Sequence, residues 1–308
     1  MPTNLTVNSN YVGQVAGEIV GASFKEADTI GKNLVTVLPD VDFQVSLRKI
    51  SYANGRTNYS CGFTPEGAVT LSEKLLTPKK IKNEQEICKE DLRQIWSSAS
   101  MGFSAHNDNL PKDVEAALLN EILGDTAEAT DADIWQGDAT NDGSFDGFTT
   151  LFTADAGIIK AGNGITSLGA AVTKGTVVAE IEKVLNAIPV SLRRKSDLVI
   201  GVSNDIALAY QQALVSAGIS NGLGGADIEL RYGNYKLEVI NGLADNTFVV
   251  YQVKNLYFAT GLMADHNEIR IKDMDESDLT GMVRFKMVYS AGVQYVNPSE
   301  IIWYLTTT

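Results

Sequence analysis

The chain has 308 residues, a formal net charge of −13 and a pI near 4.6. Its hydrophobic content of 44% and charged content of 20% are those of a folded protein and argue against extensive disorder. General nucleic-acid binding needs a basic surface that displaces counterions from phosphates, and the acidic balance argues against it. A protein of this charge can still enclose nucleic acid without gripping it.

Two features bear on the cellular compartment. Cys61 and Cys88 form neither a disulfide framework nor a metal-binding spacing, so we expect two reduced thiols. The N-terminal residues lack the basic region and apolar core of a secretory signal, and no apolar run approaches the ~18 residues of a membrane span. We therefore expect a protein that is made and folded in a cytoplasm and has no membrane segment.

The N-terminal region carries apolar residues at helical spacing from Tyr11 to Ile30, interrupted by Gly13, Gly17 and Gly21. The pattern predicts an arm of marginal helicity that becomes ordered along a neighbour. A buried amphipathic helix fits the same pattern equally well.

A long hairpin is predicted next. Asp42–Tyr52 alternates apolar and polar residues, as a half-buried strand does, with an irregularity near its end. A polar tip with the turn signal Asn54-Gly55 follows, and the chain returns through Ala68–Ile87. Because isolated two-stranded ribbons are marginal in water, something else must cover this arm.

After a short predicted helix at Lys89–Ser100, a long helix is expected from Asn109 to Gln136, with Pro111 in its first turn. The 26 residues from Pro111 to Gln136 would span ~39 Å at ~1.5 Å per residue, so the helix would cross its domain as a strut. Between Asp108 and Asp146, eight Asp and three Glu stand against one basic residue, Lys112. Such a strut suits a surface that meets a partner of opposite charge.

The second half of the chain alternates helices and strands, after loops and short strands at 149–171. A compact α/β lobe is expected over 172–265, built from helices Thr173–Ala187 and Asn204–Ala217 and strands Asp197–Ser203, Leu230–Ile240 and Thr247–Val253. Three further strand signals lie within Glu268–Leu305. We expect these strands to pair with the strut and close the first lobe.

The sequence offers little for catalysis. His106 and His266 have no nucleophile motif beside them, and no phosphate-binding loop is present. Asp138, Asp142 and Gly143 match a calcium loop at positions one, five and six, but Thr149 replaces the carboxylate required at position twelve. A solvated turn is therefore favoured, and we predict no enzyme, catalytic residue, cofactor or bound metal.

In this order, the hairpin, strut, α/β lobe and returning strands resemble the major capsid proteins of tailed bacteriophages. The chain is similar to the HK97-like shell fold, including relatives in crAss-like and Bacteroidetes-infecting phages. The residues that carry the resemblance are NYVGQVAGEIVGASFKEA, VTLSEKLLTPKKI, ICKEDLRQIW, NLPKDVEAALLNEI, IWQGD…GSFDGF and MVRFKMVYSAGVQYVNPSEI. Their order and spacing cover essentially the entire chain.

The resemblance implies an α+β fold with four parts. These are an N-terminal arm (1–40), an extended E-loop hairpin (41–88), a peripheral domain with a long spine helix (89–171 and 266–308) and an axial domain (172–265). It implies hexamers and pentamers that form an icosahedral shell around double-stranded DNA, assembled in the host cytoplasm and present in the virion. A portal and scaffold or decoration proteins would be its other partners. An encapsulin-type compartment and, from another class, a soluble calcium-binding domain remain as alternatives.

The charge pattern then suggests contacts between subunits. We expect bases of the hairpin arm in one subunit to approach acids of the strut in another. The bases are Arg48, Lys49, Arg56, Lys79, Lys80 and Lys82, and the acids are Asp125, Glu128, Asp131, Asp133, Asp138 and Asp142. Some relatives join subunits by a Lys–Asn isopeptide bond from the E-loop. No lysine lies between Lys49 and Lys74, so that cross-link is not expected here.

Overall fold

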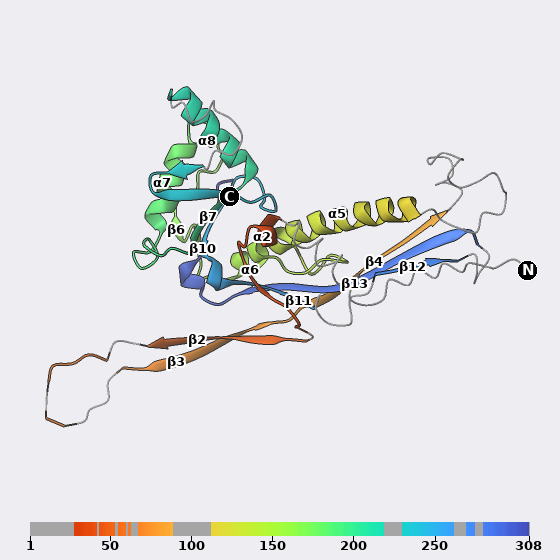
Figure 1. Cartoon of the computed structure of the whole chain (residues 1–308). Coiled ribbons are helices and arrows are strands. Elements are labelled where there is room, and N and C mark those ends of the chain that lie inside the picture. The colour runs from red at the N-terminus through yellow and green to blue at the C-terminus, as the bar shows by residue number, and fades with distance from the viewer. Residues whose placement is uncertain are drawn as a thin grey trace, which may run out of the picture.

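The computed structural model describes residues 28–41, 43–52, 55–59, 61–62, 67–88, 112–218, 230–261, 269–274 and 280–307, with the backbone alone at 112–121, 269 and 273. The molecule is elongated: a long helix-on-sheet body carries a lobe at one end, and a hairpin projects from it (Figure 1). The expected helix at 89–100 and nearly all of the expected arm at 11–30 lie outside the described residues.

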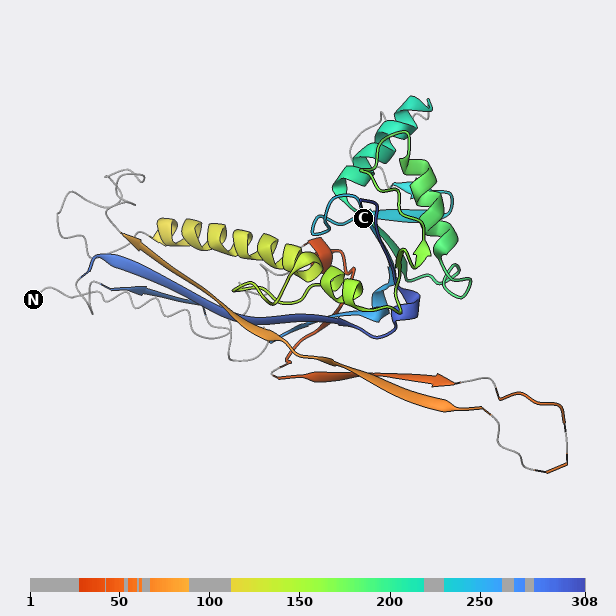
Figure 2. The same cartoon turned by 180° about the vertical axis from the view of Figure 1, so that it is seen from behind.

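The body consists of a sheet covered on one face by α5 (Lys112–Gln136), which confirms the long helix expected from the sequence (Figures 1 and 2). Buried Leu123 and Ile134 of α5 share a core with Phe285 and Met287 of the sheet. The strands, in spatial order, are β1 (Thr36–Leu38), β11 (Leu256–Thr260), β13 (Met282–Tyr295) and β12 (Ile269–Asp273), and β4 (Lys79–Cys88) pairs with β13 as well.

The predicted hairpin is confirmed, but it is shorter than expected. β2 (Val45–Tyr52) pairs antiparallel with β3 (Val69–Leu76) along their whole lengths. The return segment Lys79–Cys88 was expected in the same arm, and this is wrong: as β4 it pairs with β13 over ten residues. This segment pairs with the body sheet because pairing there buries Ile81, which is 6% exposed, in the main core.

The lobe is a seven-stranded sheet with α7 (Val177–Ala187) and α8 (Asn204–Ser216) packed on one face. Both helices end where the sequence predicts, but α7 begins at Val177 rather than Thr173, and the N-cap of α8 is Ser203 rather than Asn204. In spatial order the strands are β6 (Gly164–Ile165), β5 (Ile159–Ala161), β14 (Ile302–Leu305), β10 (Thr247–Gln252), β7 (Leu198–Val202), β9 (Tyr235–Val239) and β8 (Arg231–Tyr232).

Two strands, β14 and β11, belong to other parts of the molecule than the expected ranges assigned them. β14 was expected to close the body but pairs with β10 of the lobe, where Tyr304 stacks on Phe248 at 5.9 Å between ring centroids. β11 lies within the range expected for the lobe, yet it pairs with β1 and β13 of the body. The chain therefore passes back and forth between the two parts, which ties them together.

An aromatic cluster joins lobe and body where α5 ends. Trp135 lies 5.3 Å from Phe148 and 5.9 Å from Tyr251 between ring centroids, and Phe148 stacks on Phe152 at 5.8 Å. All four side chains are fully buried. Phe148 and Phe152 belong to α6 (Phe148–Ala154), in a stretch where only loops and short strands were expected. Such pairs stabilise a junction beyond the area they bury. The 3₁₀ turns η2 (Val253–Asn255) and η3 (Pro298–Glu300) complete the connections.

Two glycines in this region should respond in opposite ways to alanine. A Cβ at Gly124, inside α5, would meet nothing within 4 Å, whereas one at Gly242 would lie 2.5 Å from the Asp131 carbonyl oxygen and 2.7 Å from Trp135 Cδ1. Gly124→Ala should raise the free energy of unfolding by about 0.5–1 kcal/mol through helix propensity. Gly242→Ala should lower it by about 1–3 kcal/mol through overpacking. Urea unfolding measures both, and equal effects would contradict the described packing.

Candidate assembly surface

The hairpin has two unlike faces. On one face, Leu47 and Leu76 turn toward the body and are 8% and 1% exposed. Further out, the apolar side chains change to the opposite face. There the cross-strand pairs Ile50–Leu71 and Tyr52–Val69 lie directly opposite one another. We call these four residues the outer apolar face.

The outer apolar face is exposed along its whole length. Ile50, Leu71, Tyr52 and Val69 are 72%, 62%, 64% and 70% exposed. β2 and β3 form a two-stranded sheet of their own, so their outer edges also lack a partner strand among the described residues. Figure 2 shows the hairpin leaving the body, with no other element of the described chain beside its far half. Exposed apolar side chains on an unpaired ribbon are typical of a surface that another chain covers.

The root of the hairpin is held by a small apolar cluster and a few polar contacts. Val41, Leu47, Leu76 and Ala259 form the cluster. Lys49 Nζ donates to Asn297 Oδ1 at 2.7 Å. The hairpin is thus anchored at one end and unsupported at the other.

The structure places two more of the predicted contact bases in bonds within the chain. Lys79 Nζ donates to the carbonyl oxygens of Ala139 at 3.1 Å and Ser144 at 2.7 Å. Lys79 therefore does meet the acidic segment, but through backbone oxygens of its own chain, and it is better placed to hold that loop than to reach a neighbour. Arg48 lies 4.0 Å from Glu73 on the adjacent strand.

Lys82 pairs with an acid on its own strand. Its Nζ lies 2.7 Å from Glu84 Oε2, and Lys286 Nζ lies 2.9 Å from Glu84 Oε1. Hydrogen bonds from these two ammonium groups lower the pKa of Glu84 to about 2. Arg56 and Lys80 are exposed, at the hairpin tip and on β4 respectively.

Four of the six predicted acids are accessible to a partner. Asp125 and Glu128 on α5 and Asp142 on the following loop are exposed, and Asp138 is half-buried. Asp138 Oδ1 accepts hydrogen bonds from the Thr140 N–H at 2.9 Å and its hydroxyl at 2.8 Å, and these bonds lower the pKa of Asp138. The calcium-like loop thus uses this carboxylate to close its own turn.

The other two acids face inward. Asp133 is half-buried and accepts the Ser144 hydroxyl at 3.0 Å; burial raises its pKa against that bond. Asp131 is only 5% exposed, so the expectation that it presents a charge to a neighbour is wrong. Asp131 lies four residues after the buried Ala127 and three before the buried Ile134, so helical periodicity places it on the buried face of α5. A count of acidic residues does not show this.

Asp131 instead anchors the described start of the chain. The Thr29 N–H of α2 (Asp28–Gly31) donates to Asp131 Oδ1 at 3.0 Å, and Trp135 Nε1 donates to the Thr29 hydroxyl at 2.8 Å. Burial raises the pKa of the Asp131 carboxyl, and its hydrogen bonds from Thr29 oppose this. The contact links the N-terminal segment to the end of the strut.

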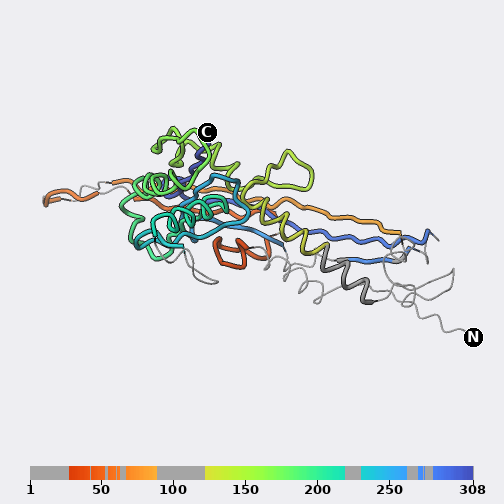
Figure 3. Tube along the Cα trace, turned by 90° about the horizontal axis from the view of Figure 1, so that it is seen from above, coloured from red at the N-terminus to blue at the C-terminus, as the bar shows by residue number. Residues whose placement is uncertain are grey.

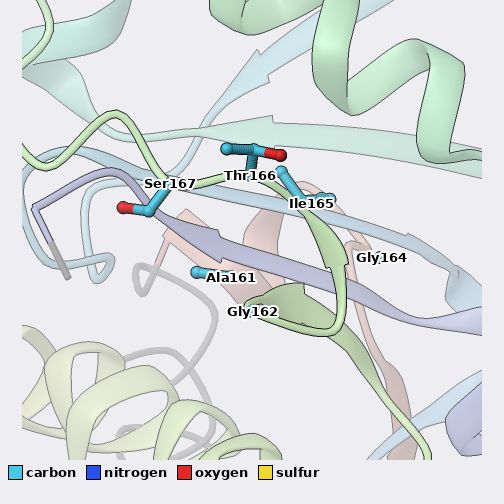
Figure 4. Close-up of a pocket in the computed structure, with 6 residues that line it drawn as sticks. All are labelled: Ala161, Gly162, Gly164, Ile165, Thr166 and Ser167. Carbon is cyan, nitrogen blue, oxygen red and sulfur yellow. The ribbon is translucent and has the colours of Figure 1, made fainter.

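A surface pocket of the lobe offers no catalytic arrangement. Figure 4 shows its lining, in which the only polar side-chain atoms are the hydroxyls of Thr166 and Ser167. Nearby, the buried Glu180 accepts the Tyr304 hydroxyl at 2.6 Å and Lys183 Nζ at 2.7 Å, so it serves the core. In the described part of the chain, no three His, Cys, Asp or Glu side chains are grouped to hold a metal ion. No helix there is both long and apolar enough to cross a membrane.

Comparison with known proteins identifies the fold. No model of a protein family matches the sequence, and no curated protein does either. Solved structures match over nearly the whole chain. The procapsid of satellite phage P4 is 11% identical with a TM-score of 0.57, covering 94% of this chain and 98% of that one. The capsid of a native GTA particle is 13% identical with a TM-score of 0.62, covering 100% and 96%. A virus-like particle from Pyrococcus furiosus is 10% identical with a TM-score of 0.52, covering 93% and 96%.

The chain therefore has the α+β, HK97-like fold of phage capsid proteins, as the sequence resemblance implied. Figure 3 shows its main parts from above, with the hairpin at one end, the lobe above the junction and α5 along the body strands.

The buried Asp131 carboxyl makes a testable contribution to pH dependence. Its pKa lies above the ordinary 3.8 in the folded chain, so the folded state binds this proton more tightly than the unfolded state. The charged form therefore costs stability as the pH rises through and above that range. Asp131→Asn removes the charge and keeps an oxygen for the Thr29 N–H. We expect the free energy of unfolding of the variant, relative to the parent, to increase from pH 3 to pH 7 in urea titrations.

Asp125→Asn on the exposed side of α5 controls for the loss of one acid. An equal difference between variant and parent at both pH values would contradict this reading.

Proposed function

We propose that this chain is a major capsid protein that assembles with copies of itself into the icosahedral head shell of a tailed phage. The observation that carries the proposal is the outer apolar face, which points away from the body that anchors it. A two-stranded ribbon that exposes four large apolar side chains to water is unfavourable. In a closed shell, a neighbouring copy of the chain would cover this face in every subunit. The likeness to capsid structures over 93–100% of the chain supports this role.

The finer features of the proposal follow from the fold class. Copies form hexamers and pentamers, and the shell encloses double-stranded DNA without sequence-specific contacts, as its acidic balance favours. Its place is the virion capsid after assembly in the host cytoplasm, with a portal and scaffold or decoration proteins as partners. The role is structural rather than enzymatic.

A compartment that encloses protein cargo is the second candidate. The chain is also similar to a virus-like particle from Pyrococcus furiosus, at a coverage close to that of the phage capsids, and that particle is not named as a phage. Nuclease-protected DNA of genomic length inside native particles supports the phage shell. Particles free of DNA support the compartment.

The outer apolar face yields the main test of assembly. Leu71→Lys places a charge on this face, whereas Thr70→Lys places the same charge on the adjacent residue, which points to the opposite face. Burying an unpaired ammonium is costly, so Leu71→Lys should reduce assembled particles at least tenfold, while Thr70→Lys should assemble more nearly like the parent. Electron microscopy and sedimentation measure the yield. Equal assembly by the two variants, or a monomeric parent under all conditions, would overturn the proposal.

Charge pairs between subunits are proposed as a weaker, collective contribution. The bases are Arg56 and Lys80, both exposed, and the acids are Asp125, Glu128, Asp138 and Asp142 of a neighbour. Each exposed pair contributes only about 0–1 kcal/mol, but a shell repeats it many times. Arg56→Glu should raise the protein concentration needed for assembly, most strongly at low salt. The double variant Arg56→Glu with Asp142→Lys should recover part of the loss. Assembly of Arg56→Glu that matches the parent at every salt concentration would remove this contact.

A further inference from the structure

The angle at which the hairpin leaves the body sets the position of its far end. Its strands are eight residues long, or ~27 Å at ~3.4 Å per residue. A tilt of about 10° at the root would move the far end by about 5 Å, which is the spacing of neighbouring strands in a sheet. A shell of uniform curvature therefore requires that some contact fix the angle at which the hairpin leaves the body.

Lys74 joins the hairpin to the body through an ion pair. Its Nζ lies 3.2 Å from Asp155 Oδ2, directly after α6, and 3.4 Å from the centroid of the Tyr295 ring at the end of β13. Three elements distant in sequence thus meet at one ammonium group. The side chain of Lys74 is 30% exposed and that of Asp155 is 27% exposed, so water screens the pair only in part.

Contacts within the body fix the Asp155 carboxylate independently of Lys74. The Tyr295 hydroxyl donates to Asp155 Oδ2 at 2.5 Å, and the Gly157 N–H donates to Asp155 Oδ1 at 2.8 Å. Burial raises the pKa of Asp155, but the hydrogen bonds from Tyr295, Gly157 and Lys74 outweigh burial and lower it. Burial lowers the pKa of Lys74, and pairing with Asp155 opposes this. Asp155, Tyr295 and Gly157 form a fixed socket for a cation.

The other contacts at the root are less able to set an angle. Lys49 makes a single hydrogen bond to a neutral amide of Asn297. Gln294 donates to the Leu75 carbonyl oxygen at 3.1 Å, a bond that does not depend on the identity of the hairpin side chain. The apolar cluster is non-directional. A charge held over an aromatic ring and against a fixed carboxylate has a defined position in three dimensions.

We propose that Lys74 and its socket position the hairpin, and so determine the geometry in which a second copy meets the outer apolar face. Lys74 is a positioning residue: it stays within its own subunit and acts on assembly through the direction of the hairpin. The inference about assembly rests on the proposed function, whereas the inference about hairpin order does not.

The test compares Lys74→Met with Lys49→Met. Each keeps a long unbranched stem on the body-facing side of the hairpin and removes one ammonium group. In Lys74→Met, amide hydrogen exchange over 45–52 and 69–76 should become roughly tenfold faster in the unassembled chain, because the charge-assisted bonds that hold the root are lost. The particles should show a broad range of diameters by electron microscopy. Lys49→Met should change both readouts less, and Lys74→Arg, which keeps the charge and stacks on Tyr295, should restore a narrow range.

The outcomes separate the two claims. Unchanged hairpin exchange and uniform particles of parental diameter in Lys74→Met would overturn the positioning role. If Lys74→Met does not fold, Tyr295→Phe decides, since it keeps the ring and removes only the hydroxyl that fixes Asp155. Parental exchange and diameter in Tyr295→Phe would then overturn the role. If the parent forms no particles, the proposed function fails, while exchange in the unassembled chain still tests the socket.

Discussion

The structure is organised around a hairpin whose outer apolar face is not covered by the body of its own chain. A two-stranded sheet has only two faces, and the body covers one of them at the root alone. Beyond that point the apolar side chains lie on the opposite face, so folding back onto the body would not bury them. The hydrophobic free energy still available to this chain would therefore be gained only by contact with another molecule. A monomer would leave this apolar surface in water, whereas a repeating shell could bury it in every copy.

A projecting ribbon is useful only if the body that carries it is stiff. Stiffness comes from the way the chain crosses between its two parts. β11 leaves the lobe for the body sheet, β14 returns to the lobe, and the aromatic cluster around Trp135 fills the junction at the end of α5. Lobe and body thus share a core, and the chain passes between their two sheets at β11 and β14, so relative motion would break apolar contacts in that core. The Lys74 socket extends this rigidity one step further, from the body into the hairpin.

The charges of the strut have more than one role. Composition places them in a single class, as acids concentrated between Asp108 and Asp146. Packing divides them: Asp131 binds the Thr29 N–H inside the protein, Asp138 closes a turn, and Asp125 and Glu128 remain on the surface. Asp125, Glu128 and the exposed Asp142 remain able to meet a neighbour's bases, as does the half-buried Asp138. Lys79 shows the same division among the bases, since it holds the acidic loop of its own chain.

Much of the fold followed from local pattern. The long helix, the hairpin, α7, α8 and the strands β7 and β10 were predicted because helical spacing, alternation, capping residues and turn signals act within a few residues of one another. Even the change of face in the hairpin is encoded in the sequence, because the apolar positions shift from odd to even residue numbers between Leu47 and Ile50. Alternation shows that a strand has an apolar side, but it does not say which strand lies next to it. The sheet membership of β4, β11 and β14, the burial of Asp131 and the meeting of Lys74, Asp155 and Tyr295 were therefore decided by tertiary structure alone, because each depends on competition for one core between segments far apart in the chain.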